Sequence, residues 1–172
     1  MLGLVAMDLR LRQIADHLLT LNDSAAFNPA SIGVKLLPHL FVLDIERDVS
    51  KRVCQLRIRL VGTAIDNVFR RPLQGHALEE YIHGPRGNEV IASFHHCADT
   101  HESLWMRQVV HIRDRAPRFV EGVAIYLKPE RIYGGLIVGE FAGLAESFER
   151  IPLKSLPVQP SGWIANSSIP PR

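Results

Sequence analysis

The sequence has little cysteine, no long hydrophobic run and almost no net charge. Cys54 and Cys97 stand far apart and form no C-x-x-C pair, which argues against a disulfide scaffold and favours a reducing cytoplasm. No apolar run approaches the ~20 residues that a membrane-spanning helix needs. The opening segment MLGLVAMD lacks a basic region and a small-residue cleavage pattern, so we expect no signal peptide. We therefore expect a cytoplasmic protein without a membrane partner.

The charge of the chain gives no reason to expect a nucleic-acid partner. The net charge is +2, and 22% of the residues are charged, so no global field attracts a polyanion. The segment 51–71 is locally basic, but aromatic residues do not interleave with its cations as they do on single-strand-binding platforms. We interpret its cations as a solvated face of a sheet.

Catalytic motifs are missing as well. The chain contains no G-x-S-x-G, H-E-x-x-H, P-loop or dinucleotide fingerprint. Glu79 and Glu80 are adjacent, so on a helix their side chains point about 100° apart and do not face one substrate. We therefore expect a protein that is not an enzyme.

The chain is long enough for one domain with extensions. An amphipathic helix is expected in residues 1–24, a domain in residues 30–146 and a proline-rich tail in residues 147–172. The helix carries apolar residues at alternating spacings of three and four: Leu4, Met7, Leu11, Ile14, Leu18 and Leu21. This stripe fits either a cover for the protein's own sheet or a dimer seam, and we expect a homodimer in which the helix does both.

The domain is expected to be α+β. The segments LFVLDIE, CQLRIRL, LWMRQVVHI, FVEGVAIYL and GGLIVGEF predict five strands. In the second of these, Cys54, Leu56, Ile58 and Leu60 alternate with polar residues, which predicts one buried and one exposed face. Between the second and third strands, AIDNVF, GHALEEYIHG and GNEVIASFHHCADTHE predict helices. This order predicts a five-stranded antiparallel sheet with helices on one face.

The order of elements resembles a PAS domain. The segment RLVGTAIDNVFRRPLQGHAL is similar to the signature of a bacterial, mainly α-proteobacterial, stand-alone PAS subfamily, roughly R-x-x-G-T followed by G-R-D-L-x-G. The matching residues are Arg59, Gly62, Thr63, Arg71, Leu73 and Gly75, whereas Arg70 and Pro72 stand where the family usually has glycine and an acidic residue. The similarity spans about residues 36–141. It implies a sensory or regulatory module with a cavity between sheet and helices for a small ligand, and a surface that contacts a signalling protein.

The three histidines of SFHHCADTHE disperse when residues 87–102 are placed on a helix at about 100° per residue. Cys97 and His101 then lie on the same apolar stripe as Phe94, His95 lies on its border, and His96 points away. Two ligands on one face are too few for a zinc site, so we expect no metal. In some PAS domains a histidine on this helix ligates haem, which makes His101 an alternative haem ligand, but we expect a colourless protein without a cofactor.

We expect the ligand pocket to be bounded by Phe69, Phe94, Cys97 and His101, with Trp105 as a further candidate. Three hypotheses follow. The first is a sensory module that binds a small ligand and signals through protein contacts. The second is an adaptor of the same fold with a filled cavity, and the third is a small pocketed α+β enzyme.

Overall fold

The computed structural model describes residues 7–82, 84–110, 118–140 and 149–152 of the chain. The helices in this part are α1 (Leu9–Leu19), α2 (Thr63–Phe69) and α3 (Gly84–Thr100), with short 3-10 helices η1 (Ser24–Ala26), η2 (Pro29–Ile32), η3 (Leu37–His39) and η4 (Leu78–Glu80). The strands are β1 (Leu40–Arg47), β2 (Val53–Val61), β3 (Leu104–Val110), β4 (Arg118–Leu127), β5 (Arg131–Glu140) and β6 (Glu149–Pro152).

All the strands belong to one antiparallel sheet in the order β2-β1-β5-β4-β3-β6. The five predicted strands are confirmed, and so is the α+β class. The structure adds β6, which pairs with the outer edge of β3 and lies within the segment that we expected to be a tail. Its sequence, ERIP, gives too short a pattern to predict a strand, and its pairing is a tertiary effect.

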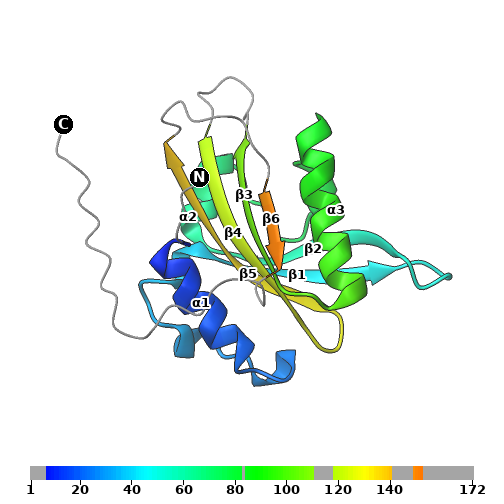
Figure 1. Ribbon diagram of the computed structural model, residues 1–172, viewed down its shortest axis with the longest axis horizontal. Helices are drawn as coiled ribbons and strands as arrows, with labels where there is room; N and C mark the ends of the chain where they lie inside the picture. Colours follow the sequence, from blue (N-terminus) through cyan, green and yellow to red (C-terminus); the bar gives the residue numbers. More distant parts are fainter. Residues whose placement is uncertain (1–6, 83, 111–117, 141–148, 153–172) are drawn as a thin grey trace, which may run out of the picture.

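Helices cover both faces of the sheet, and each face has its own hydrophobic core (Figure 1). On one face, α3 packs over β2, β3, β4 and β5, and α2 packs beside β5. The buried residues of these helices include Ile65, Val90 and Phe94. On the other face, α1 packs over β4 and β5. The second core includes Leu11, Ile14, Leu18, Val42, Trp105, Val123, Ile125 and Tyr133.

The regular alternation predicted for β2 is interrupted at two places. Leu43 of β1 pairs with Ile58 and Val42 pairs with Leu60, so Arg59 is an extra residue in the ladder. Such a bulge reverses the faces of the residues that follow it. Ile58 therefore lies in the core under α3, whereas Leu60 packs against the core under α1.

A second register shift changes the environment of Cys54. Glu46 pairs with Gln55 and Arg47 pairs with Val53, which leaves Cys54 as an extra residue. Its side chain is exposed, and its thiol donates to the carbonyl oxygen of Glu46 at 3.3 Å. The prediction that Cys54 and Leu60 share one buried face is therefore wrong, because two bulges divide the strand.

The helical block also differs from its predicted boundaries. The sequence predicts a helix over residues 75–84, closed by Gly84-Pro85, but in the described residues 75–82 the structure forms only the short η4. Gly84 instead begins α3. Proline is favoured in the first turn of a helix, where its missing N–H needs no partner.

The apolar stripe of the N-terminal helix faces the protein's own sheet. Leu11, Ile14 and Leu18 are fully buried there, and Met7 packs at the margin of the same core. Leu4 lies outside the described residues. This observation agrees with the first of the two readings of the stripe, a cover for the sheet.

A buried carboxylate holds the start of α1 on the sheet. Glu121 of β4 is only 7% exposed, and its Oε1 accepts hydrogen bonds from the backbone N–H of Asp8 at 2.8 Å and from Trp105 Nε1 at 2.9 Å. Asp8 is the N-cap of α1. Burial raises the pKa of Glu121 above its ordinary value, although these two hydrogen bonds and the nearby charge of Arg107 oppose the rise.

We predict that Glu121→Gln keeps the fold and becomes more stable, relative to the wild type, as the pH rises. The amide oxygen of Gln can accept the same two hydrogen bonds, but it carries no charge. Because the folded wild type has the raised pKa, it binds the proton more tightly than the unfolded chain, so its stability falls as the pH rises through the raised pKa. Urea unfolding of both proteins between pH 4 and pH 8 measures this difference.

The control for this prediction is Glu121→Ala, which removes the acceptor of Trp105 and Asp8. It should lower the free energy of unfolding by about 2 kcal/mol. If the wild type instead gained stability over Glu121→Gln with rising pH, the ionised carboxylate would be the favoured form in the fold, and the prediction would be wrong.

The turn between β4 and β5 contacts both layers of the molecule. Arg47 donates to Glu130 Oε2 at 3.1 Å and to the carbonyl oxygen of Ala98, near the end of α3, at 3.0 Å. On the other side, the backbone N–H of Ser24 donates to the carbonyl oxygen of Lys128 at 2.7 Å. The turn therefore joins the end of α3 to the segment that follows α1.

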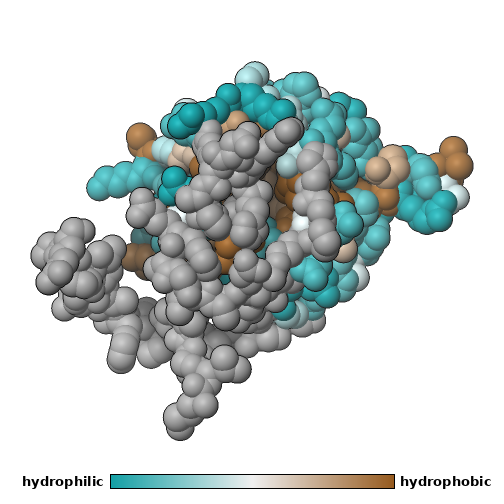
Figure 2. Space-filling view, turned by 90° about the horizontal axis from the view of Figure 1, so that it is seen from above, coloured by the Kyte–Doolittle hydropathy of each residue, from teal (hydrophilic) through white to brown (hydrophobic). Residues whose placement is uncertain are grey.

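The turn between β1 and β2 is different, since it projects from the body of the molecule (Figure 1). Val49 in this turn is fully exposed. Figure 2, seen from above, shows the projection as a group of hydrophobic and hydrophilic side chains to one side of the main surface.

Candidate functional site

Three of the five predicted pocket residues lie together on the face covered by α2 and α3. Phe94 and Cys97 are buried in the core there, and Phe69 packs against it partly buried. The ring of Phe94 meets that of Phe41 edge-on at a centroid distance of 5.8 Å, and Phe69 meets Tyr81 at 6.4 Å. These side chains form part of a packed core, in which Phe94 of α3 is in direct contact with Phe41 of the sheet.

Cys97 has an environment that suppresses its reactivity. Its side chain is fully buried, and burial raises the pKa of its thiol to about 12. The thiolate is the reactive form of cysteine. Cys97 therefore acts as a small apolar core residue.

We predict that the native protein has one rapidly reacting thiol. A disulfide reagent such as DTNB at pH 8 should modify the exposed Cys54 at once and leave Cys97 unmodified, because almost none of its thiol is ionised. Denaturation should release the second thiol. Cys54→Ser is the control and should abolish the rapid phase; two rapid thiols in the native wild type would contradict the burial of Cys97.

The other two predicted pocket residues lie elsewhere. Because α3 ends at Thr100, His101 does not extend the inward stripe of the helix. It has a φ of 58°, is exposed, and stacks on Tyr126 with ring centroids 3.8 Å apart. Trp105 is buried in the core on the opposite face of the sheet, under α1. The expected grouping of His101 and Trp105 with Phe94 is therefore not observed.

The two histidines within α3, His95 and His96, each lie near a different glutamate. His95 Nε2 lies 3.5 Å from Glu79 Oε1, and His96 Nε2 lies 3.0 Å from Glu102 Oε2. Within the described residues, no three side chains of the His, Cys, Asp and Glu types gather in a way that could hold a metal ion. The prediction of a protein without metal or haem stays a prediction.

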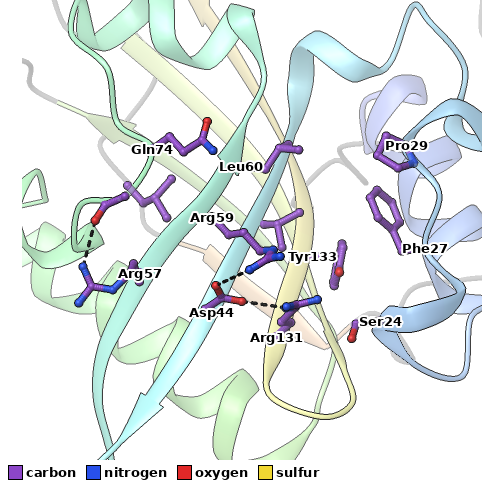
Figure 3. Close-up of a pocket in the computed structure, with 13 residues that line it drawn as sticks. Ser24, Phe27, Pro29, Asp44, Arg57, Arg59, Leu60, Gln74, Arg131 and Tyr133 are labelled. Carbon is purple, nitrogen blue, oxygen red and sulfur yellow. Dashed lines mark hydrogen bonds and ion pairs between the residues drawn. The ribbon is translucent and has the colours of Figure 1, made fainter.

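A pocket of about 560 Å³ lies on the opposite face of the sheet, where β1, β2 and β5 meet the segment 24–29 (Figure 3). Charged side chains are found at its centre and apolar ones at the end near this segment. The residues that line it are Ser24, Phe27, Pro29, Val42, Asp44, Arg57, Ile58, Arg59, Leu60, Gln74, Gly75, Arg131 and Tyr133.

The strand register brings the charges of the pocket together. Asp44 of β1 pairs with Arg57 on β2 and with Arg131 on β5. Arg131 Nε donates to Asp44 Oδ1 at 2.8 Å, and Arg59 donates to Asp44 Oδ2 at 3.2 Å. The bulge at Arg59 is what places this residue beside Asp44, out of the regular alternation.

Arg57 forms an ion pair with a different carboxylate, that of Glu46. Its Nε donates to Glu46 Oε1 at 2.5 Å, and its terminal nitrogen donates to the carbonyl oxygen of Gly75 at 3.0 Å. These hydrogen bonds fix the segment that carries η4 against the edge of β2. The bond to Glu46 raises the pKa of Arg57, and the bond to Asp44 raises the pKa of Arg131, so both guanidinium groups stay charged at any physiological pH.

The segment 24–29 forms the cover of the pocket. Phe27 packs on Tyr133 of β5 with ring centroids 4.6 Å apart. Ile32, which follows the segment, is buried in the core under α1. With the backbone hydrogen bond from Ser24 to Lys128, these contacts hold the cover at both ends.

A second pocket of about 330 Å³ lies beside α2 and β5. It is lined by His39, Ala64, Asn67, Val68, Arg70, Arg118, Leu136 and Val138. Burial and the charge of Arg10 lower the pKa of His39, so this histidine is neutral at physiological pH. The larger pocket is the stronger candidate site, because hydrogen bonds between three strands fix its charged groups.

The sequence reasoning did not select the residues of the larger pocket. The sequence predicts a solvated face for Arg57 and Arg59, marks Arg59 only as a residue of the signature, and gives no role to Asp44 or Arg131. One signal was present: Asp44 is a charged residue inside an otherwise apolar strand, LFVLDIE. A charge in such a strand needs a partner nearby, but the sequence does not show that Arg131 supplies it.

Searches with family models, among curated proteins and among solved structures returned no match to this chain. Among the described residues, no helix has both the length and the apolar character that a membrane crossing requires.

Proposed function

We propose that the chain is a PAS-like regulatory module that binds a small molecule in the pocket under the segment 24–29 and passes the bound state to a protein partner. The observation that carries this proposal is the construction of the pocket. Its floor is the sheet, its charges are held between strands, and its cover is the segment that follows α1. A ligand there would contact rigid and separately anchored parts of the molecule at once.

Two observations support the resemblance to PAS domains. The described elements follow the order of two strands, a helical block and three strands on which the resemblance rests. Arg70, which stands where the subfamily usually has glycine, has a φ of 54° at the end of α2. This left-handed conformation is one that glycine adopts readily, so a glycine would fit at this position, as the signature has it.

The proposed route of the signal follows the chain. The cover of the pocket is joined to α1 by four residues, 20–23. A ligand that moves Phe27 against Tyr133 would shift the end of α1 on the sheet. The outer side of α1 exposes Leu9 and Leu19, and we propose that this side contacts the second chain of a homodimer or the signalling partner, in the cytoplasm.

A filled-cavity adaptor is the second candidate. The observation that favours it is the tight core between α3 and the sheet, where Phe41 and Phe94 are in contact. In that case the protein would act through its surface alone.

Ligand-binding experiments on the wild type and on a variant with a blocked pocket distinguish the two candidates. Native mass spectrometry of the freshly purified chain would show a co-purified ligand, and a thermal-shift screen with water-soluble metabolites would show compounds that raise the melting temperature. Leu60→Trp should abolish both signals, because Leu60 lines the pocket and is only partly buried.

The control variant is Val49→Trp, which adds the same side chain at a fully exposed position of the β1–β2 turn, outside the pocket and outside α1. It should keep the wild-type response to every compound. If Leu60→Trp folds and responds like the wild type, the ligand does not bind in this pocket; if no compound acts on any of the three proteins, the adaptor is favoured.

A further inference from the structure

We infer that the ligand of this pocket is a small organic monoanion, with a carboxylate-type group attached to a flat apolar body. This inference rests on the proposed function, since it names the class of molecule that the same pocket would take. It follows from three features: the balance of charge, the direction of the hydrogen-bond donors and the position of the apolar wall.

Among the charged residues that line the pocket, two arginines share one carboxylate. Arg59 and Arg131 both pair with the carboxylate of Asp44, whereas Arg57 pairs with Glu46 and is also attracted by the charge of Glu80. The pair Arg59 and Arg131 therefore carries one positive charge more than Asp44 compensates. A ligand with one negative charge completes this balance, whereas a phosphate dianion exceeds it.

The donors of the two arginines are only partly used by Asp44. Each guanidinium group has five N–H donors, and one nitrogen from each arginine contacts Asp44. Figure 3 shows Arg59 and Arg131 on two sides of Asp44, with Tyr133 and Phe27 farther toward the cover. Arg131 also forms a side-chain hydrogen bond with Tyr133. A ligand carboxylate beside Asp44 would receive charge-assisted hydrogen bonds from the N–H groups of both arginines that these contacts leave unused.

The end of the pocket near the cover suits an apolar body. Phe27 and Tyr133 lie in contact at an angle of 52°, and Pro29, Val42 and Leu60 complete that end. Small-molecule sites commonly combine a mostly apolar wall with a few polar groups that fix orientation. Because the charged and apolar ends are separate, a ligand with an anionic head and a flat body can satisfy both.

The test uses four probes with the full chain at low ionic strength. 2-Naphthoate carries both required parts, 2-naphthamide has the same body without the charge, acetate has the head alone, and inorganic phosphate has a higher charge. We expect isothermal titration calorimetry to give 2-naphthoate a Kd at least 10-fold lower than that of each other probe, and this advantage should shrink as salt is added.

Variants locate the binding. Arg59→Gln and Arg131→Gln should each weaken 2-naphthoate binding at least 10-fold and leave the weak binding of 2-naphthamide unchanged. The matched control is Arg52→Gln, because Arg52 is an exposed arginine that pairs with Asp48 outside the pocket. It should bind 2-naphthoate like the wild type. Arg59 is half-exposed, so its variant gives a readable result even if Arg131→Gln does not fold.

The outcomes separate this inference from the proposed function. Equal binding of 2-naphthamide and 2-naphthoate would overturn the requirement for a charge but keep the pocket as a ligand site. Phosphate binding as tight as that of 2-naphthoate would overturn the apolar body. If 2-naphthoate does not bind while metabolites stabilise the wild type and not Leu60→Trp, the inference fails and the proposed function stands. If those metabolites have no effect either, both fail.

Discussion

Replacing Gly134 by alanine should prevent the domain from folding. Gly134 lies in β5, and a Cβ atom there would come within 2.0 Å of the carbonyl oxygen of Val123 and 2.4 Å of the ring of Phe41. The first of these atoms belongs to the backbone of the neighbouring strand and cannot rotate away. Inserting one carbon into a packed core usually costs about 1–3 kcal/mol, and here a backbone must also move, so we expect a loss of at least 4 kcal/mol.

The matched control is Gly139→Ala in the same strand. A Cβ atom on Gly139 would meet no atom within 4 Å, and its φ does not lie in the left-handed region. The control should therefore express and melt like the wild type. Circular dichroism and soluble yield of both variants measure the effect; a folded Gly134→Ala protein with wild-type stability would show that β4 and β5 are not paired as described.

Replacing Ile14 by alanine should destabilise the protein by about 3 kcal/mol without changing its mass in solution. Ile14 is fully buried between α1 and the sheet, where its side chain lies against Gly135. Large-to-small changes of buried aliphatic residues typically cost 2–5 kcal/mol. Because this contact is within one chain, the loss belongs to folding and does not depend on protein concentration.

Leu19→Ala is the control on the same helix. Leu19 is 53% exposed, so its loss should change the free energy of unfolding by less than about 0.5 kcal/mol. If α1 also contacts a second chain through its outer side, Leu19→Ala rather than Ile14→Ala should weaken the dimer in sedimentation experiments. A stable monomeric Ile14→Ala variant derived from a dimeric wild type would instead make the buried stripe a dimer seam.

The local content and spacing of apolar residues made most of the fold predictable. The β-branched and aromatic residues of LFVLDIE and FVEGVAIYL identify strands, and the spacing of Leu11, Ile14 and Leu18 identifies the buried side of α1. These patterns are local, so the sequence displays them directly. The same patterns do not show which strands are neighbours or which face of the sheet a helix covers.

The bulges and the end of α3 were not predictable from periodicity. An extra residue at Arg59 changes the face of Leu60 without any mark such as glycine or proline in the strand. A helical wheel assumes that the helix continues through every residue placed on it. The wheel therefore predicts an inward side chain for His101, although the helix ends at Thr100. Boundaries depend on tertiary contacts, which a periodic pattern does not contain.

Gly62 is required at its position for a reason that the sequence does not display. The signature singled it out, and its φ of −74° is open to any residue. A Cβ atom there, however, would lie 2.2 Å from the carbonyl oxygen of Pro38 in η3. Glycine is required because two backbone segments meet at this point, and that contact is visible only in the folded chain.

The β4–β5 turn constrains how this chain can change in evolution and in engineering. Its three residues, 128–130, are tied through Ser24 to the cover of the pocket and through Arg47 to the end of α3. An insertion in this turn would separate Lys128 from Ser24 and Glu130 from Arg47. Changes of length and inserted tags should therefore be poorly tolerated in the β4–β5 turn. The β1–β2 turn, which projects from the body with Val49 fully exposed, is the place to insert a label or a reporter.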